Sequence, residues 1–320
     1  MPKSKMDESS LIFRTRAYTP IEFSPSINLI EENVYLGDLA AATNETLLDS
    51  LGIRRILTLD IKPLPASIRE RYICLFIFAL DQEDADLLTH FDEALQFIMT
   101  ANPIEKVLVH CYFGVSRSAT IMTAYIMHKH HLSVDEALEF VKAQRKLVFP
   151  NAGFIAQLHL FCLMNWQLDE NNLQYRLYKL YTTAKQVQKD KQFAVVVSTF
   201  FTDEITPSQF HFKCKKCRKP LFSEMSVFPH DVGKTLHWNI NACSIGNPIC
   251  NQGLLIRPLP WMQEAKEATA GKLNCPHCGA KIGSFDWNGS KCPCGARMEP
   301  IFYISVEKVD EVPPKLNSNQ

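Results

Sequence analysis

The sequence lacks net charge, long apolar runs and an apolar start. Its 34 basic residues balance 34 acidic ones, so any contact with a polyanion needs a local patch. No apolar run approaches the roughly 18 residues of a membrane span, and the longest candidate, 193–201, contains Ser198 and Thr199. The polar start, MPKSKMDESS, does not have the core of a signal peptide. We therefore expect a soluble protein of the cytoplasm and nucleus, without a membrane partner.

Cysteine is scarce over the first 210 residues, which contain only Cys74, Cys111 and Cys162. The other eight cysteines fall between Cys214 and Cys294. Because thiols stay reduced inside cells, this cluster indicates metal ligands rather than disulfides. The uneven use of cysteine predicts two domains, and 320 residues are enough for each to bury its own core.

Short apolar runs at 54–59, 73–80 and 106–110 have the length of buried strands and alternate with helical patterns. This alternation is typical of an α/β fold, with a mostly parallel central sheet flanked by helices.

Two helix starts have the spacing of a capping box. Thr89 with Asp92 and Ser133 with Glu136 each place an acidic side chain three residues after a hydroxyl. A third helix is expected to follow Asn151.

The stretch LVHCYFGVSRSAT, 108–120, places a cysteine at a strand end, then a glycine and an arginine in front of a helical pattern. Loop amides and the first helical turn would bind a phosphate there and favour a thiolate. Cys111 is predicted to attack phosphorus and form a phosphocysteine, Arg117 to grip two phosphate oxygens, and Ser118 to donate to the departing thiolate. The alternative is an inert buried cysteine. The predicted phosphate-binding residues are Tyr112, Phe113, Gly114, Val115, Ser116 and Arg117.

HCYFGVSRS resembles the HCxxGxxRS phosphate-binding loop of cysteine-dependent protein phosphatases. NVYLGDLAAATNETLLDSLGIRRILTL resembles the opening of their dual-specificity branch and PNAGFIAQL its closing helix, so the resemblance covers 27–167. It implies phosphoprotein substrates carrying phosphotyrosine, phosphoserine or phosphothreonine, and no cofactor for catalysis. Phe113 departs from the family, where alanine is common. An aromatic ring there would pack behind the loop or form part of its rim.

The leaving alcohol needs a proton, so the reaction needs a carboxylic acid on a second loop. Four acids lie in FALDQEDADLL, namely Asp81, Glu83, Asp84 and Asp86. The position of the family's general acid matches Asp81, whereas Asp84 and Asp86 also fit charges in a first helical turn. The resemblance implies that His110 tunes the thiolate, although a histidine at a strand end is as often a satisfied core residue.

Three cysteine pairs near the C-terminus have the spacing of metal ligands: CKKC at 214–217, CPHC at 275–278 and CPC at 292–294. Six ligands are too many for one tetrahedral site and two short of filling two. The residues that could complete them are His230, His237, Cys243 and Cys250.

The stretches CRKPLFSEMSVFPH, CNQGLLIRPLPWM and GSFDWNGSKCPCG resemble the zinc-binding domain of one subtype of dual-specificity phosphatase. The resemblance implies that His230 and Cys250 are the missing ligands, Cys243 a free thiol and His237 a rim residue. The two CxxC pairs are expected to share one of two structural zinc ions, so chelation should unfold this region and leave the catalytic domain folded. The alternative is a small core of unlinked reduced cysteines. The predicted ligands are Cys214, Cys217, His230, Cys250, Cys275, Cys278, Cys292 and Cys294.

A polar stretch with a Tyr and Leu stripe joins the two domains and predicts a helix whose stripe packs on one of them. The expected organisation is a disordered start at 1–25, a catalytic domain at 26–168, a helical connector at 169–200, a small β-rich zinc-binding domain at 201–308 and a disordered tail at 309–320.

KCKKCRKP contains five basic residues in eight, which fits either a solvated knuckle or contacts with RNA phosphates. The subtype resemblance implies docking on the pre-60S ribosomal particle, through rRNA or ribosomal proteins. We therefore expect a protein phosphatase with a docking domain or, alternatively, a ribosome-assembly factor whose phosphatase activity is weak or dispensable. A sulfurtransferase would also use a cysteine in an anion-binding loop, but it would not explain the His-Cys start, the five-residue spacing to Arg117 and the loop of Asp81 together.

Overall fold

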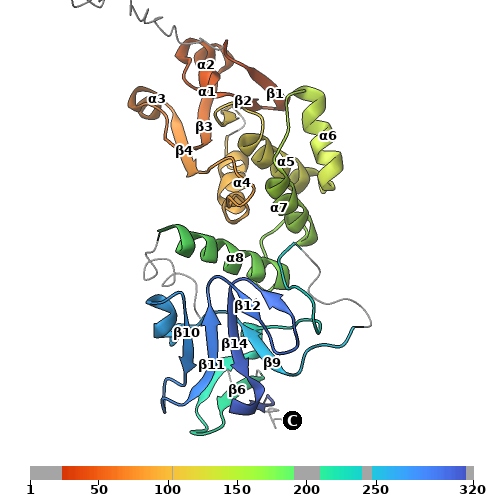
Figure 1. Cartoon of the computed structure of the whole chain (residues 1–320). Helices are drawn as coiled ribbons and strands as arrows, with labels where there is room; N and C mark the ends of the chain where they lie inside the picture. Colours follow the sequence, from red (N-terminus) through yellow and green to blue (C-terminus); the bar gives the residue numbers. More distant parts are fainter. Residues whose placement is uncertain (1–23, 103, 191–209, 240–246, 315–320) are drawn as a thin grey trace, which may run out of the picture.

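The computed structural model describes residues 24–314 apart from 103, 191–209 and 240–246. The expectations for 1–23, for 191–200 of the connector, for 315–320 and for Cys243 lie outside the described residues. An α/β domain, a single helix and a β-rich region follow one another in space as they do in the chain (Figure 1).

A five-stranded sheet forms the centre of the α/β domain. Its order is β1-β2-β5-β3-β4, in which β1 is antiparallel to β2 and the other neighbours are parallel. The mostly parallel sheet flanked by helices is therefore confirmed. The strands are β1 (Ile27–Glu31), β2 (Val34–Gly37), β3 (Ile53–Asp60), β4 (Ile73–Phe78) and β5 (Lys106–His110).

Helices cover both faces of this sheet, which is why β3 and β5 are buried along most of their length. One face buries Ala42, Leu48 and Ile68 of α1, α2 and α3 against Ile56 and Leu108. The other face carries α4 to α7. The helices are α1 (Leu39–Ala42), α2 (Glu45–Leu51), α3 (Ala66–Arg71), η1 (Leu88–His90), α4 (Phe91–Met99), α5 (Arg117–His130), α6 (Val134–Gln144) and α7 (Ala152–Leu163).

One of the two predicted capping boxes is present. Ser133 and Glu136 cap the start of α6 reciprocally. The prediction for Thr89 is wrong: Thr89 lies inside η1, and its hydroxyl donates to Asp86 Oδ2 at 2.6 Å. Because the Thr89 hydroxyl is engaged with Asp86, three residues before it in the chain, it does not cap α4.

The C-terminal region consists of antiparallel strands in three sheets. One has the order β10-β11-β14-β9-β8, one the order β15-β6-β7, and β12 pairs with β13. The strands are β6 (His211–Cys214), β7 (Pro220–Ser223), β8 (Val227–Phe228), β9 (Gly253–Ile256), β10 (Ala270–Asn274), β11 (Lys281–Asp286), β12 (Ser290–Lys291), β13 (Arg297–Met298), β14 (Ile301–Ser305) and β15 (Val309–Val312), with short turns η2 (Glu224–Ser226), η3 (Gln263–Lys266) and η4 (Val306–Lys308).

The predicted disordered tail contains an ordered strand. Val309 to Val312 form β15, and each residue pairs with one of β6, from Val309 with Cys214 to Val312 with His211. The polar composition of VDEV concealed a strand that is held by backbone hydrogen bonds at a sheet edge.

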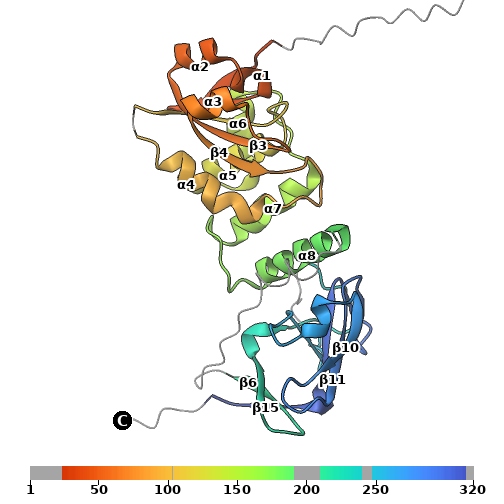
Figure 2. The same ribbon diagram turned by 90° about the vertical axis from the view of Figure 1, so that its left-hand side faces the viewer.

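Helix α8 (Leu173–Asp190) lies between the two domains (Figures 1 and 2). Its apolar stripe was expected to pack on one domain. Instead, Tyr178 contacts Trp238 of the C-terminal region with ring centroids 4.9 Å apart and donates to Asp86 of the α/β domain at 2.6 Å. The stripe is therefore covered from both sides.

Candidate functional site

Cys111 lies at the C-terminal end of β5, in the middle of the sheet, with 1% of its surface exposed. Its Sγ accepts hydrogen bonds from Gly114 N at 3.2 Å and from Ser118 Oγ at 3.1 Å. Both donors lower the energy of a negative sulfur. The loop thus supports a thiolate, and Ser118 contacts the sulfur as predicted.

Gly114 is required by the shape of the loop. Its φ of 67° lies in the left-handed region, and a Cβ there would be 2.4 Å from the carbonyl oxygen of Gly37. Neighbouring loop carbonyls point outward, where Tyr112 O accepts from Leu39 N and Val115 O from Phe149 N. This arrangement leaves the Gly114 amide directed at the cysteine.

Arg145, which the sequence analysis missed, holds the outside of the loop. Its Nε donates to Gly114 O at 2.9 Å and its Nη2 to Phe113 O at 3.3 Å. Its Nη1 donates to Ser26 Oγ and Asn28 Oδ1, each at 2.9 Å. The side chain is buried, which lowers the pKa of its guanidinium. In the sequence nothing distinguishes it from the nearby Lys142 and Lys146.

Arg117 is the first residue of α5, and its guanidinium is anchored on one side. Nη1 donates to Asp60 Oδ1 at 3.0 Å and to Ala79 O at 3.1 Å. Nε is buried and, among the described residues, has no hydrogen-bond partner. A buried donor of this kind needs an acceptor, and an oxyanion bound in the loop would supply one.

Asp81 follows β4 and lies over the loop. Its Oδ1 accepts from Ser116 Oγ at 2.7 Å and from Asn151 Nδ2 at 3.0 Å, and its Oδ2 is 3.9 Å from Arg117 Nε. The structure therefore brings Asp81, Arg117 and the cysteine loop together. Asn151, the N-cap of α7, is a further site residue that the sequence analysis did not assign.

The other acids of the same segment point elsewhere. Glu83 is exposed, Asp84 pairs with Lys189 of α8 at 3.3 Å, and Asp86 accepts hydrogen bonds from Thr89 and Tyr178. Asp81 is the acid of this group that contacts the loop.

His110 is fully buried beside the cysteine. Its Nε2 lies 2.8 Å from Thr58 Oγ1 and its Nδ1 3.3 Å from Cys111 O. Burial lowers the pKa of His110 to about 4, so the ring is neutral at pH 7. A neutral ring that donates from Nδ1 and accepts from Thr58 holds the strand end in place.

Aromatic side chains stand at the rim of the loop. Tyr112 and Phe113 are 47% and 58% exposed and form an edge-to-face pair with centroids 4.7 Å apart. Of the two placements expected for Phe113, the structure has the rim. Phe149, bonded through its backbone to Val115, is also exposed.

The first cysteine cluster of the C-terminal region contains both CxxC pairs, Cys214 with Cys217 and Cys275 with Cys278. Sulfurs of different pairs lie 3.8 Å and 3.7 Å apart. Two sulfurs on one tetrahedral zinc lie about 3.8 Å apart, because each Zn–S bond is about 2.3 Å. The donor set therefore fits one tetrahedral ion.

The second cluster contains His230, Cys250, Cys292 and Cys294. Cys250 Sγ is 3.7 Å from Cys292 Sγ, and Cys294 Sγ is 3.5 Å from His230 Nε2. His237 is not part of this cluster but packs edge-on against Tyr181 of α8. Each cluster offers four ligand atoms, so both could hold a metal ion in a closed structural site.

Among the described residues, no helix combines the length and apolar character needed to cross a membrane. Residues 34–162 match the family model "Dual specificity phosphatase, catalytic domain". The chain is 34% identical to dual specificity protein phosphatase MPK-4 of Drosophila melanogaster, over 89% of this chain and 87% of that protein.

It is also 34% identical to dual specificity protein phosphatase 12 of Rattus norvegicus, over 88% of each chain. Among solved structures, the phosphatase domain of Yvh1 from Chaetomium thermophilum aligns at 28% identity with a TM-score of 0.42, over 45% of this chain and 100% of that chain. Because these relatives are 34% identical to the chain over 88–89% of its length, the chain belongs to the dual-specificity protein phosphatases.

Proposed function

We propose that the protein hydrolyses phosphotyrosine and phosphoserine or phosphothreonine in phosphoproteins through a phosphocysteine at Cys111. The observation that carries this proposal is the unsatisfied, buried Nε of Arg117, which lies on the same loop as the hydrogen-bonded sulfur of Cys111 and 3.9 Å from Asp81.

In the first step, the Cys111 thiolate attacks phosphorus and the bond from phosphorus to the ester oxygen breaks. Arg117, fixed through Nη1 by Asp60 and Ala79 O, offers its remaining donors to the phosphoryl oxygens. Asp81, in its carboxylic acid form, gives its proton to the leaving oxygen, which departs as a neutral alcohol or phenol. The product is a phosphocysteine.

In the second step, a water molecule attacks the phosphorus of this intermediate. The Asp81 carboxylate accepts the water's proton, the S–P bond breaks, and inorganic phosphate leaves. Ser118, whose Oγ lies 3.1 Å from the sulfur, donates a hydrogen bond to the returning thiolate. The acid is then protonated and the sulfur negative, as at the start of the cycle.

The two ligand clusters are proposed to hold zinc, since thiolate and imidazole donors in a closed set of four are typical of structural zinc sites. Bound zinc would tie β6 to the β10–β11 turn and the β8–β9 segment to the β12–β13 hairpin. No step of catalysis requires it.

The test of the phosphatase proposal compares the wild type with Cys111→Ser on phosphotyrosine and phosphothreonine peptides. We expect release of phosphate by the wild type from both peptides and none by the variant. A wild type as inactive as Cys111→Ser would disprove the proposed enzyme and leave a binding protein.

A second function, docking on a pre-60S ribosomal particle in the nucleus and cytoplasm, is favoured by the exposed lysines of the first knuckle. Lys215, Lys216 and Lys219 are exposed, while Arg218 is paired with Asp310. Lysines that neutralise phosphates release counterions from RNA and make binding dependent on salt.

The docking test is co-sedimentation with ribosomal precursors. Lys215→Glu with Lys216→Glu should abolish sedimentation, whereas the control pair Lys272→Glu with Lys291→Glu, also exposed, should not. Equal behaviour of the two pairs would remove the docking role from this knuckle, and loss of docking with intact hydrolysis would separate the two functions.

A further inference from the structure

The segment that follows the proposed acid is held by two helices. Residues 81–87, here the acid loop, run from Asp81 to the buried Leu87. On the α7 side, a Cβ on Gly153 would lie 1.9 Å from Glu83 O, so the loop backbone lies directly on this helix. Gln157 of α7 donates to Ala85 O at 2.8 Å and accepts from Leu87 N at 2.9 Å.

Helix α8 holds the same loop through a part-buried hydrogen bond, besides the ion pair of Lys189 with Asp84. Tyr178 Oη donates to Asp86 Oδ1 at 2.6 Å, and the same oxygen accepts from Thr89 N at 3.1 Å. Burial, reinforced by Asp86, raises the pKa of Tyr178 well above its ordinary value. The hydroxyl therefore remains a donor throughout the pH range in which the enzyme would work.

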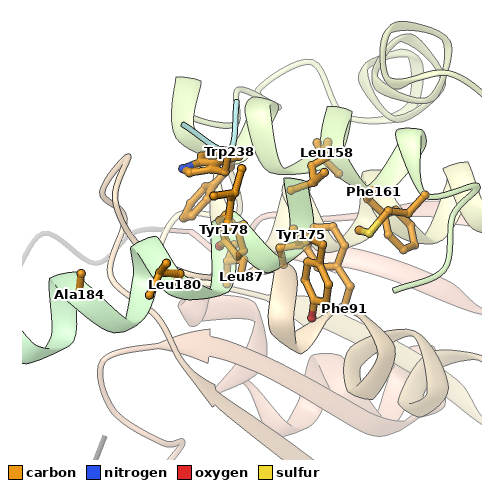
Figure 3. Packing of buried hydrophobic residues seen from close by; sticks show 14 of the residues in the cluster. Leu87, Phe91, Leu158, Phe161, Tyr175, Tyr178, Leu180, Ala184 and Trp238 are labelled. Carbon is orange, nitrogen blue, oxygen red and sulfur yellow. The ribbon is translucent and has the colours of Figure 1, made fainter. Parts of the chain in front are cut away.

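On its other side, Tyr178 packs against the C-terminal region. Tyr178 is 1% exposed and packs edge-to-face with Trp238, with ring centroids 4.9 Å apart. Figure 3 shows Tyr178 close to both Trp238 and Leu87. Further along α8, Lys185 pairs with Glu299 at 3.1 Å, and Gln188 donates to Trp287 O at 3.1 Å.

One buried apolar cluster runs through all three parts of the molecule. It includes Phe91 and Phe161 of the α/β domain, Tyr178 of α8, and Trp238 and Trp287 of the C-terminal region. Close-packed interiors transmit small displacements. Helix α8, and with it Tyr178, therefore shares its buried contacts with the C-terminal region.

We propose that Tyr178 is a positioning residue for the acid step: Trp238 fixes Tyr178, Tyr178 fixes Asp86, and the acid loop thereby holds Asp81 over the phosphate site. The C-terminal region then supports catalysis through this packing, in addition to any metal binding or docking. This inference rests on the proposed role of Asp81 as general acid.

A protonation defect differs from a general loss of structure in its dependence on the leaving group. kcat/KM reports the steps up to P–O bond cleavage. A poor leaving group such as phenol needs the acid's proton, whereas p-nitrophenol leaves readily without it. The ratio of kcat/KM for p-nitrophenyl phosphate to that for phenyl phosphate is therefore the readout, and Asp81→Asn should raise this ratio most.

The full-length Tyr178→Phe variant keeps the ring and loses the hydroxyl. We expect kcat/KM for phenyl phosphate to fall about three- to tenfold, and that for p-nitrophenyl phosphate to change less than about twofold. Asp86→Asn, which weakens the acceptor, should shift the ratio in the same direction. The matched control is Tyr72→Phe, which removes another tyrosine hydroxyl bonded to an aspartate, Asp49, at 2.9 Å.

Trp238→Ala tests the C-terminal end of the path, with Trp261→Ala as its control, because the Trp261 indole donates to Leu221 O within that region. We expect Trp238→Ala to raise the substrate ratio and Trp261→Ala to leave it unchanged. If Tyr178→Phe has the same substrate ratio as Tyr72→Phe, or lowers kcat/KM equally for both substrates, the positioning role is wrong while the phosphatase proposal stands. If Asp81→Asn itself leaves the ratio unchanged, the proposed acid is wrong instead.

Discussion

Arg145 supports the phosphate loop from the side away from the substrate. Its guanidinium donates to Phe113 O and Gly114 O, and to Ser26 and Asn28 on the chain before and within β1. A planar fork with five donors can reach all of these acceptors, whereas a lysine ammonium is a compact charge on a flexible stem. The loop conformation that aims the Gly114 amide at Cys111 therefore depends on an arginine at this position.

Arg145→Lys is expected to lower the free energy of unfolding by about 2–4 kcal/mol, since several buried hydrogen bonds to a charged group are lost. It should also lower kcat/KM at least about tenfold, because the loop amides lose their alignment. Denaturant unfolding and peptide hydrolysis measure the two effects. Arg69→Lys is the control, as Arg69 donates to Leu64 O away from the loop, and an equal effect of both variants would contradict the proposed support.

The burial of His110 should make the stability of the protein depend on pH. Its pKa is lowered from 6.5 to about 4 by burial, so the unfolded chain binds more protons than the folded one between these values. Stability should then fall as the pH falls through this window, by about 2 kcal/mol for this residue between pH 7 and pH 5.

The measurement is denaturant unfolding at pH 7 and pH 5. The fall should be smaller by that amount in His110→Asn and unchanged in His131→Asn, which replaces an exposed histidine. A fall as large in His110→Asn as in the wild type would show that other groups cause the pH dependence.

Local and remote contacts explain which site residues the sequence could predict. Cys111, Gly114, Arg117 and Ser118 lie within one short stretch of the chain, the loop and the first turn of α5, so their spacing alone implied the chemistry. Long-range partners had no such signal. Asp60 is 57 residues from Arg117, Arg145 is 31 residues from Gly114, and Asn151 is 70 residues from Asp81. The parallel sheet brings the ends of β3, β4 and β5, and with them Asp60 and Asp81, to one edge, while the ends of α6 and α7 bring Arg145 and Asn151 there.

At the scale of elements, β15 lies beside one metal-ligand cluster. It pairs along the whole of β6, and its Val309 stands opposite Cys214. Lys308 O also accepts from Lys215 N at 3.0 Å, within the first knuckle. The strand therefore braces the segment that carries two of the four ligands.

Deleting 309–320 should weaken metal binding at the Cys214 cluster at least about tenfold, because a ligand segment that must be ordered on binding loses affinity. Competition with a zinc chelator measures this affinity. A chain lacking only 313–320 keeps β15 and should bind like the wild type. Equal affinities of the two truncated chains would show that β15 does not support the site.

Elements were predictable where one segment contained its own signal. Ser133 and Glu136 cap a helix within four residues. The length of three short apolar runs was enough to predict the strands β3, β4 and β5. Strand β15 has no apolar run, and its partner β6 lies about a hundred residues earlier in the chain, so pairing alone makes it a strand. The contacts between α8 and the C-terminal region also join residues far apart in the sequence, so the sequence does not predict them.

At the scale of the whole molecule, the two domains share a continuous core. The buried cluster that contains Phe161 of α7 also contains Trp287 and Phe302 of the C-terminal region, joined through Tyr175 and Tyr178. Two independent domains would each close their own core. The expectation was that the catalytic domain stays folded when metal is removed, and this continuity adds that the folded domain should then be less stable.

Chelation of zinc is therefore expected to unfold the C-terminal region and also to lower the melting temperature of the α/β domain by several degrees. The first effect arises because the eight clustered ligand residues would lose the proposed zinc ions. The second arises because α8 loses the cover that Trp238 provides, and a loss of about 1–2 kcal/mol lowers the melting temperature of a domain of this size by roughly 2–8 °C. Calorimetry with and without chelator measures both transitions.

A chain with Trp238→Ala is the control for the second effect. It should melt at a lower temperature than the wild type in the presence of zinc, and chelation should add little further shift to its α/β transition, because the contact is already missing. If chelation leaves the α/β transition of the wild type in place, the continuous core contributes nothing to the stability of that domain. If it shifts wild type and variant equally, the coupling passes through contacts other than Trp238, such as Lys185 with Glu299.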